Sequence, residues 1–192
     1  MKKRSLVVVI LMCVVTLNYA QQKLEIKTSK SELRWSCDYA FYFGGHYGTI
    51  AFKDGYFIKN KGKITGGEFT IDMSSIICTD IENAEANEGL VNHLKNEDFF
   101  NVEKFKTAKL VITKVVYHDA VKMKIYASLT IKDITLPVDF QAEVNYKKEQ
   151  MTTRFKIDRT LWGITYNSKE VEGALKNGLI SDAIGFEVSL SL

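Results

Sequence analysis

The strongest constraint on the fold is a repeat of two in the placement of apolar side chains. Between Val121 and Ile131 every odd-numbered residue is apolar, and most of the even-numbered residues are Lys, Ser or Thr. Successive side chains of a β-strand point to opposite faces, so this pattern predicts a strand with one buried and one solvated face. The same alternation recurs in other segments, at residues 33–35, 69–73, 136–146, 155–157 and 186–192.

Short polar segments separate the predicted strands. Asp54-Gly55, Asn60-Lys61-Gly62 and Gly66-Gly67 are interpreted as turns, because glycine adopts positive φ at little cost. The segment 132–135 is short enough to join two strands as a hairpin. Pro137, the only proline, is expected at a strand start or at an outward, unpaired position. Several strands at this spacing predict an antiparallel sandwich or barrel.

One segment departs from the period of two. Leu90, Val91 and Leu94 recur at the spacing of a helical turn among polar residues, which predicts a short helix over residues 84–94. Phe99 and the phenylalanine after it then return toward the core. Because no linker, repeat or change of composition interrupts the chain, one domain is expected over residues 23–192.

Residues 1–20 have the features of a secretory signal peptide. Residues 2–4 are basic, residues 6–17 form an apolar run broken once, and Ala20 is small. About 12 apolar residues are too few to span a bilayer of roughly 30 Å. An uncleaved anchor is the alternative, and lipidation of Cys13 is disfavoured because the residue before it is not small. We therefore expect a periplasmic or secreted protein without stable membrane insertion.

The charge distribution argues against a nucleic-acid partner. Three of the 26 basic residues lie at the start of the chain, which leaves 23 basic against 23 acidic side chains. Binding to phosphate backbones requires a clustered positive field. A balanced surface does not provide one.

No motif marks a catalytic or metal site. His46, His93 and His118 are the only histidines, and none lies at a metal-ligand spacing from Cys, Asp or Glu. No nucleophile elbow, P-loop or dinucleotide fingerprint is present, and nothing marks a His–Cys nucleophile pair. Cys37 and Cys78 would either form a disulfide or remain free thiols. We expect no enzymatic activity, no metal and no cofactor.

The interior of the predicted barrel decides between two interpretations. A closed sheet of about eight strands is filled by its own side chains or holds one small ligand, and alternation alone favours the filled core. The residues predicted to point inward are large and apolar: Trp35, Phe52, Phe69, Ile71, Leu110, Ile112, Met123, Ile125, Leu129, Phe140, Phe155 and Phe186.

Several segments, in the same order over nearly the whole chain after residue 20, resemble the YceI-like family. They are Gly48–Gly55 and Gly62–Ile76, which are similar to its N-terminal half; Asn92–Phe105, similar to its HL…DFF signature; Leu129–Val138, similar to its LTI…PV hairpin; Ile157–Tyr166, similar to its strand with Arg and Gly; and Ile180–Asp182, similar to its C-terminal end. Phe105 is followed by Lys106 where that family usually has a proline.

This resemblance implies an all-β, eight-stranded antiparallel barrel of lipocalin-like build with one short helix packed against it. It also implies an exported protein, since members of the family are exported and some hold a polyisoprenoid chain, as a quinone or prenyl pyrophosphate, inside the barrel. An exported carrier of an isoprenoid or similar long-chain lipid is the leading interpretation. A ligand-free cell-envelope interaction module and an enzyme acting on an apolar substrate are the alternatives, and a homodimer is not excluded.

With the resemblance included, the candidate ligand-binding residues are Trp35, Phe52, Phe69, Ile71, Ile112, Met123, Ile125, Leu129, Phe140, Phe155, Arg159 and Trp162. The apolar ones either line a cavity or pack as ordinary core. Arg159 is a candidate for a polar contact at the barrel mouth, because guanidinium groups match phosphate or carbonyl oxygens; the alternative is an ion pair with Asp158 or another acid. Trp162 either caps one barrel end or only packs.

Overall fold

The computed structural model describes residues 21–169 and 179–192, so the predicted signal peptide lies outside the described residues. The described part contains nine strands, one α-helix and two short 3-10 helices. In chain order they are β1 (Gln22–Glu25), η1 (Thr28–Lys30), β2 (Glu32–Tyr39), β3 (Gly45–Asn60), β4 (Lys63–Cys78), α1 (Ala84–Lys95), β5 (Thr107–Tyr117), β6 (Lys122–Ile131), β7 (Ile134–Asn145), β8 (Gln150–Asp158), η2 (Arg159–Trp162) and β9 (Ile180–Ser191).

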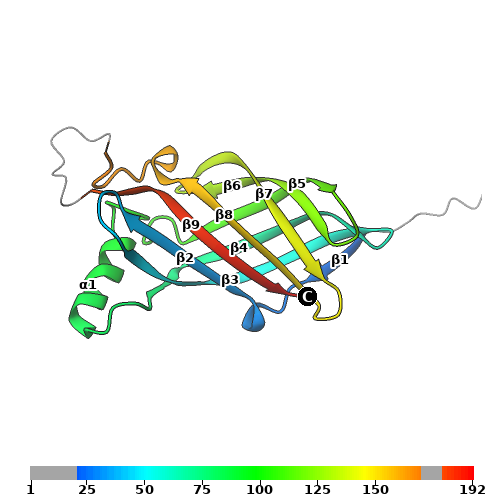
Figure 1. Ribbon diagram of the computed structural model, residues 1–192, viewed down its shortest axis with the longest axis horizontal. Coiled ribbons are helices and arrows are strands. Elements are labelled where there is room, and N and C mark those ends of the chain that lie inside the picture. Colours follow the sequence, from blue (N-terminus) through cyan, green and yellow to red (C-terminus); the bar gives the residue numbers. More distant parts are fainter. Residues whose placement is uncertain (1–20, 170–178) are drawn as a thin grey trace, which may run out of the picture.

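Strands β2 to β9 close into an antiparallel barrel, as predicted (Figure 1). The order runs β3-β2-β9-β8-β7-β6-β5-β4, and pairing of β3 with β4 completes the ring. The short strand β1 was not predicted. It pairs with residues 56–59 of β3, beyond the part of β3 that pairs with β2. Closure of the ring leaves no free sheet edge among these eight strands, apart from the local gap described below.

Two hairpin turns use two residues with positive φ. Lys61 (φ 49°) and Gly62 (φ 78°) join β3 to β4, and Lys132 (φ 49°) and Asp133 (φ 61°) join β6 to β7. Such turns match the right-handed twist of paired strands. The first was predicted as a turn, and the second falls within the predicted hairpin.

The prediction of turns at Asp54-Gly55 and Gly66-Gly67 is wrong, because both pairs lie inside strands, β3 and β4. A Cβ on Gly55 would lie 2.5 Å from the ring of Phe69, and a Cβ on Gly67 would lie 2.6 Å from the Tyr56 carbonyl oxygen. These glycines therefore permit close packing between neighbouring strands rather than reversal of the chain.

The barrel wall has the least strand pairing between β7 and β8. These strands pair only from Ala142 with Thr153 to Asn145 with Gln150, so residues 134–141 of β7 have no strand partner on that side. Counting from the closing pair of the β6–β7 hairpin, Pro137 is at a non-hydrogen-bonded position toward β6. Its nitrogen thus faces the unpaired side, and the missing N–H removes no ladder bond, in agreement with the predicted unpaired position.

Helix α1 spans Ala84–Lys95, which confirms the predicted segment. The Asn83 side chain caps it by accepting a hydrogen bond from the Ala86 N–H at 2.9 Å. Leu94 is its buried residue and directs the helix toward the barrel. No helix in the described ranges is long and apolar enough to cross a membrane.

The two ends of the barrel differ in their connections (Figure 1). We call "helix end" the end formed by residues 40–44, 79–106, 132–133 and 159–169. We call "hairpin end" the opposite end, formed by the turns at 61–62, 118–121 and 146–149. Antiparallel pairing places alternate connections at opposite ends, which fixes this assignment.

Candidate functional site: an apolar cavity inside the barrel

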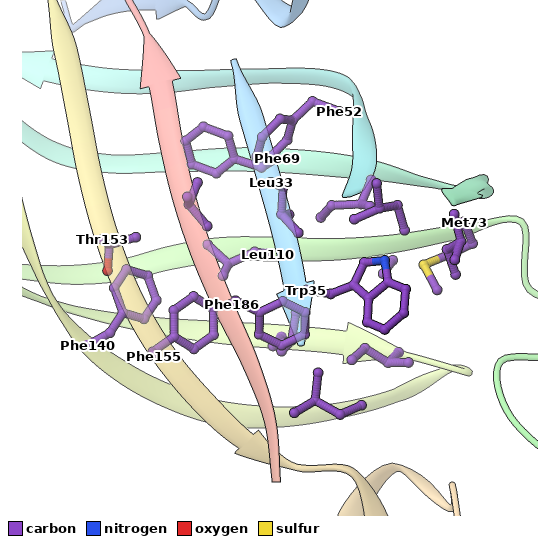
Figure 2. A pocket seen from close by; sticks show the side chains of 18 of the residues that line it. Leu33, Trp35, Phe52, Phe69, Met73, Leu110, Phe140, Thr153, Phe155 and Phe186 are labelled. Atoms are coloured by element: carbon purple, nitrogen blue, oxygen red, sulfur yellow. The ribbon is translucent and has the colours of Figure 1, made fainter. Parts of the chain in front are cut away.

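The barrel encloses a cavity with a volume of about 140 Å³. Side chains from all eight barrel strands line it, together with residues of α1 and the segment after the helix. Its free surface shows no polar atom from the residues that the structure describes. Figure 2 shows the aromatic side chains of Trp35, Phe52, Phe69 and Phe155 directed into this space.

The alternation seen in the sequence produces this lining. On β6, Met123, Ile125, Ala127, Leu129 and Ile131 are all buried, whereas the residues between them are only half-buried. Three of them, Ile125, Leu129 and Ile131, reach the cavity. One strand thus contributes both to the solid core and to the cavity wall.

A row of three aromatic rings occupies one side of the cavity (Figure 2). Phe140 and Phe155 stack with ring centroids 4.6 Å apart and an interplanar angle of 15°. Phe155 also contacts Phe186, with centroids 5.3 Å apart. The row crosses the wall where β7 and β8 separate, so these rings fill space that strand pairing leaves open.

Ten of the twelve predicted site residues line the cavity: Trp35, Phe52, Phe69, Ile71, Ile112, Ile125, Leu129, Phe140, Phe155 and Arg159. Met123 and Trp162 do not. Met123 is completely buried in the core. Trp162 is also buried, and its Nε1 donates a hydrogen bond to the Leu129 carbonyl at 3.3 Å, so it packs in η2 against β6.

Arg159 is completely buried, and its donors are engaged within the protein. Nε donates to the Ser181 carbonyl at 3.0 Å and Nη1 to the Ile164 carbonyl at 2.7 Å. Nη2 lies 3.4 Å from a carboxylate oxygen of Asp182. Burial lowers the pKa of the guanidinium, and Cys37 and Asp182 oppose that effect. Of the two interpretations, the geometry matches the structural ion pair, with Asp182 as the acid.

The helix end of the cavity is covered by the segment that contains α1. Leu94, Phe99 and Phe100 line the cavity there. His93 contacts the rings of Phe99 and Tyr166 edge-on, at centroid distances of 4.9 and 4.5 Å. Its Nε2 also lies 3.2 Å from an oxygen of Asp98. The histidine therefore holds the segment after α1 against the residues that follow η2.

Other lining residues were missed as site candidates by sequence reasoning, among them Leu33, Cys37, Ile50, Phe57, Met73, Phe99, Phe100, Thr153 and Phe186. Phe186 was predicted to point inward and could have been included on that ground. Phe57 lies after the irregular pairing between Phe52 and Asp54, which shifts the alternation of β3 and hides its inward face.

Cys37 and Cys78, the cysteines of the described residues, are free thiols. Cys37 pairs with His46 across β2 and β3, and Cys78 pairs with Gly48 across β3 and β4. One strand therefore separates the two cysteines, which corresponds to about 10 Å between their backbones. Disulfide formation requires Cα atoms within about 7 Å.

The cavity is suited to apolar groups, and few of its lining side chains are titratable. Within the described part of the chain, Cys37 and Arg159 are the only titratable residues that line it. Burial raises the pKa of the Cys37 thiol. This thiol donates a hydrogen bond to the Ser181 carbonyl oxygen, with 3.6 Å between sulfur and oxygen. An apolar cavity of roughly 150 Å³ in another protein stays dry and binds benzene. This interior therefore accepts a short apolar group as it stands, and a long chain requires lining side chains to change rotamer.

Large apolar side chains are exposed mainly at the helix end. The β2–β3 loop exposes Phe41, Tyr42 and Phe43, and Leu161 of η2 is exposed as well. We call Phe41, Tyr42 and Phe43 the aromatic loop. Apolar groups of this size on a protein surface commonly mark a site of interaction with another protein or a membrane.

Comparison with known proteins identifies the fold and the family. A YceI-like domain matches residues 24–192. A UPF0312 protein of Vibrio vulnificus is 29% identical over 119 residues, which cover 56% of this chain and 63% of the relative's length. A similar UPF0312 protein of Vibrio parahaemolyticus is 28% identical over the same shares of both chains. The chain thus spans less than two thirds of these curated relatives.

Two solved structures share the fold. Burkholderia cenocepacia BcnA superposes with a TM-score of 0.61 at 15% identity, covering 86% of this chain and 98% of that chain. A mutant of the Campylobacter jejuni YCEI protein superposes with a TM-score of 0.52 at 20% identity, covering 73% and 82% of the two chains. These likenesses show the shared fold, and the match over residues 24–192 shows that the chain belongs to the YceI-like family.

Proposed function

We propose that this chain is an exported binding protein that holds one isoprenoid or similar long-chain lipid inside its barrel. The observation that carries the proposal is the cavity inside the barrel, on whose free surface the described residues place no polar atom. Burial of a hydrocarbon chain contributes roughly 0.8 kcal/mol per methylene-sized unit, less the costs of ordering and association. An apolar interior therefore binds such a chain without residue-specific recognition.

The volume of the cavity sets how binding would occur. Because about 140 Å³ is too small for a long chain, the aromatic row of Phe140, Phe155 and Phe186 would have to turn aside as the lipid enters. Two of the rings lie at the wall where β7 and β8 lose their pairing, so this wall can widen with few hydrogen bonds broken. Arg159 has its donors committed inside the protein, and we assign it no head-group contact.

The export part of the proposal rests on residues 1–20, with their basic start, apolar run and small final residue. An exported lipid carrier exchanges its cargo with a membrane. The aromatic loop supports that role, because aromatic side chains are favourable at the boundary between headgroups and acyl chains.

A titration with isoprenoid quinones of increasing chain length tests the proposal. Trp35 lines the cavity, so bound quinone should quench its fluorescence. We expect saturation at one quinone per chain and an affinity that rises with the number of prenyl units. The Trp35→Phe variant should lose most of the quenching. Quenching that does not saturate, or that is equal in the variant, would count against binding in the barrel.

A ligand-free interaction module is the second candidate, and two observations favour it: the small cavity and the exposed aromatic loop. In that case the loop would contact another component of the cell envelope while the barrel remains closed. The same titration separates the candidates, because an interaction module binds no quinone at any chain length.

A further inference from the structure

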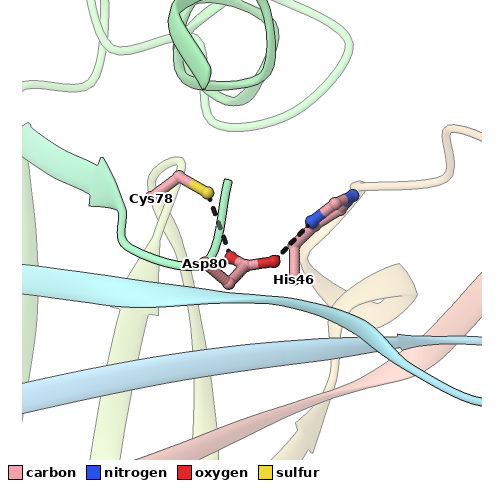
Figure 3. Close-up of side chains that lie close together, drawn as sticks. All are labelled: His46, Cys78 and Asp80. Atoms are coloured by element: carbon pink, nitrogen blue, oxygen red, sulfur yellow. Dashed lines mark hydrogen bonds and ion pairs between the residues drawn. The ribbon is translucent and has the colours of Figure 1, made fainter. Parts of the chain in front are cut away.

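A second cluster of chemically reactive side chains lies at the helix end, outside the cavity lining (Figure 3). His46 belongs to the first residues of β3, Cys78 ends β4, and Asp80 follows two residues later. Nδ1 of His46 lies 2.9 Å from Oδ2 of Asp80, and Sγ of Cys78 lies 3.1 Å from Oδ1 of the same carboxylate. One ligand atom from each residue lies within 4.8 Å of the other two.

We propose that His46, Cys78 and Asp80 form a binding site for a divalent transition metal of the zinc class, with solvent as the fourth ligand. Thiolate, imidazole and carboxylate are the three protein ligand types of Zn²⁺. Metal–ligand distances of 2.0–2.3 Å in a tetrahedron place ligand atoms about 3.3–3.8 Å apart. The observed separations of 2.9 and 3.1 Å need to open by less than about 1 Å to reach that spacing.

Two further hydrogen bonds orient the ligands. The hydroxyl of Tyr39 lies 2.9 Å from Nε2 of His46. In the metal-free cluster the Nδ1–H donates to the Asp80 carboxylate and Nε2 accepts from Tyr39; when a metal takes Nδ1, the ring proton is carried by Nε2, which then donates to Tyr39. The backbone N–H of Tyr47 donates to Oδ1 of Asp80 at 2.9 Å. Outer partners of this kind fix the tautomer of a ligating histidine and the orientation of a ligating carboxylate.

The backbone around the cluster is also fixed. The Thr79 N–H donates to the Tyr47 carbonyl at 3.0 Å, which binds the segment after β4 to β3. The Asn87 side chain in α1 donates to the carbonyls of Cys78 and Ile81 at 3.1 and 2.9 Å. Cys78 and Asp80 are thereby presented from one short segment, and His46 from the strand beside it.

Binding of a cation at this cluster would exchange the thiol proton of Cys78 for the metal. Metal binding would break the Cys78 S–H bond, form the metal–sulfur bond and release the proton to solvent. The imidazole is the most exposed of the three groups, which places the open ligand position on its side.

Titration with Co²⁺ tests the site, because a thiolate ligand gives a sulfur-to-cobalt charge-transfer band. We use the full-length chain with Cys13→Ser and Cys37→Ser, in which Cys78 is the only thiol, beside the unsubstituted chain. We expect one Co²⁺ per chain, a thiolate band, d–d absorption of four-coordinate cobalt, and displacement by Zn²⁺. His46→Gln and Asp80→Asn should each weaken binding at least about tenfold, and Tyr39→Phe by roughly tenfold.

Two matched controls make the result decisive. A chain with Cys13→Ser and Cys78→Ser retains Cys37, the other thiol, and should give no thiolate band. His93→Gln removes the other histidine that pairs with an acid, Asp98, and should leave Co²⁺ affinity unchanged. Circular dichroism and the unfolding midpoint establish that each variant is folded. Absence of the thiolate band in folded protein, or equal affinity in the His46 and Asp80 variants, would overturn the proposal. The experiment is independent of lipid binding, since none of the three ligands lines the cavity.

Discussion

The helix end and the hairpin end of the barrel are held together by different kinds of contact. At the hairpin end the turns satisfy themselves locally: Asp119 accepts from the N–H groups of Val121 and Lys122, and Asn145 accepts from those of Lys147 and Lys148. The hairpin end also has an exposed link between two turns, from the Tyr146 hydroxyl to the Ala120 carbonyl. At the helix end the links between distant segments are partly buried, as between Arg159 and Ser181 or His46 and Asp80. The aromatic loop and the His46–Cys78–Asp80 cluster thus lie at the end of the barrel whose structure depends on contacts between distant segments.

This difference has a physical origin. A tight turn with a side-chain cap gains its hydrogen bonds from residues that are neighbours in sequence, so little loop entropy is lost. The helix end must order longer connections, and it buries a charged side chain and an ion pair to do so. Buried charge is costly unless every donor finds a partner, which makes this end sensitive to single substitutions.

The largest expected effect is at Arg159. Arg159→Met should lower the free energy of unfolding by about 3–5 kcal/mol, because it leaves Asp182 and two carbonyls at the helix end without their donor. Arg154→Met is the matched control. Arg154 pairs with Glu187 on the barrel surface, where both side chains are more than half exposed, and its loss should cost at most about 1 kcal/mol. Equal losses in urea unfolding would show that Arg159 does not support the helix end.

Next in size is the effect of filling the cavity. Leu129→Trp and Phe140→Trp should each cost about 1–3 kcal/mol through overpacking and should reduce uptake of long-chain quinones more than of short ones. Tyr126→Trp, on the outer face of β6, is the control and should leave uptake unchanged. Unchanged uptake in folded Leu129 and Phe140 variants would contradict the assignment of the cavity as the binding site.

The two-residue turns give a smaller effect of opposite sign at the two ends. Asp133→Gly at the helix end should stabilise the protein by about 0.5–1 kcal/mol, because glycine adopts the observed φ of 61° without strain. Gly62→Asp at the hairpin end should destabilise it by a similar amount. Thermal unfolding measures the stability of both variants. If Gly62→Asp stabilised the protein, the explanation by backbone conformation would be wrong.

The smallest effect on stability is expected at the aromatic loop. Phe41→Ser with Phe43→Ser should change the free energy of unfolding by less than about 0.5 kcal/mol, because both side chains are exposed. The same variant should bind phospholipid vesicles more weakly in a sedimentation assay. Tyr146→Ser removes an exposed aromatic side chain at the hairpin end, and this control should not alter vesicle binding. If both variants sediment like the unsubstituted chain, the aromatic loop is not a membrane contact.

Sequence reasoning succeeded where structure depends on local periodicity. The alternation in β6 and β7 predicted the strands, their buried faces and three of the residues that line the cavity, Ile125, Leu129 and Phe140. It failed at Gly55 and Gly67, because a glycine needed for close packing between strands looks the same in sequence as a glycine needed for a turn.

The features of the helix end could not be predicted from spacing. Asp80 lies 34 residues from His46, and Asp182 lies 23 residues from Arg159. Only the barrel topology, with β3 between β2 and β4, brings His46 beside Cys78 and Asp80. The volume of the cavity was likewise undetermined, because the inward residues of a filled and a hollow barrel follow the same alternation.

The most direct test of the central claim, that the barrel binds a long apolar chain, is the content of the purified protein. The chain is expressed with its own N-terminal segment, purified without detergent and extracted with organic solvent, and the extract is analysed by mass spectrometry. The account predicts about one long-chain lipid per protein molecule, and a lower content in the Leu129→Trp variant. An extract free of lipid, together with no uptake of added quinone or prenyl lipid, would contradict it.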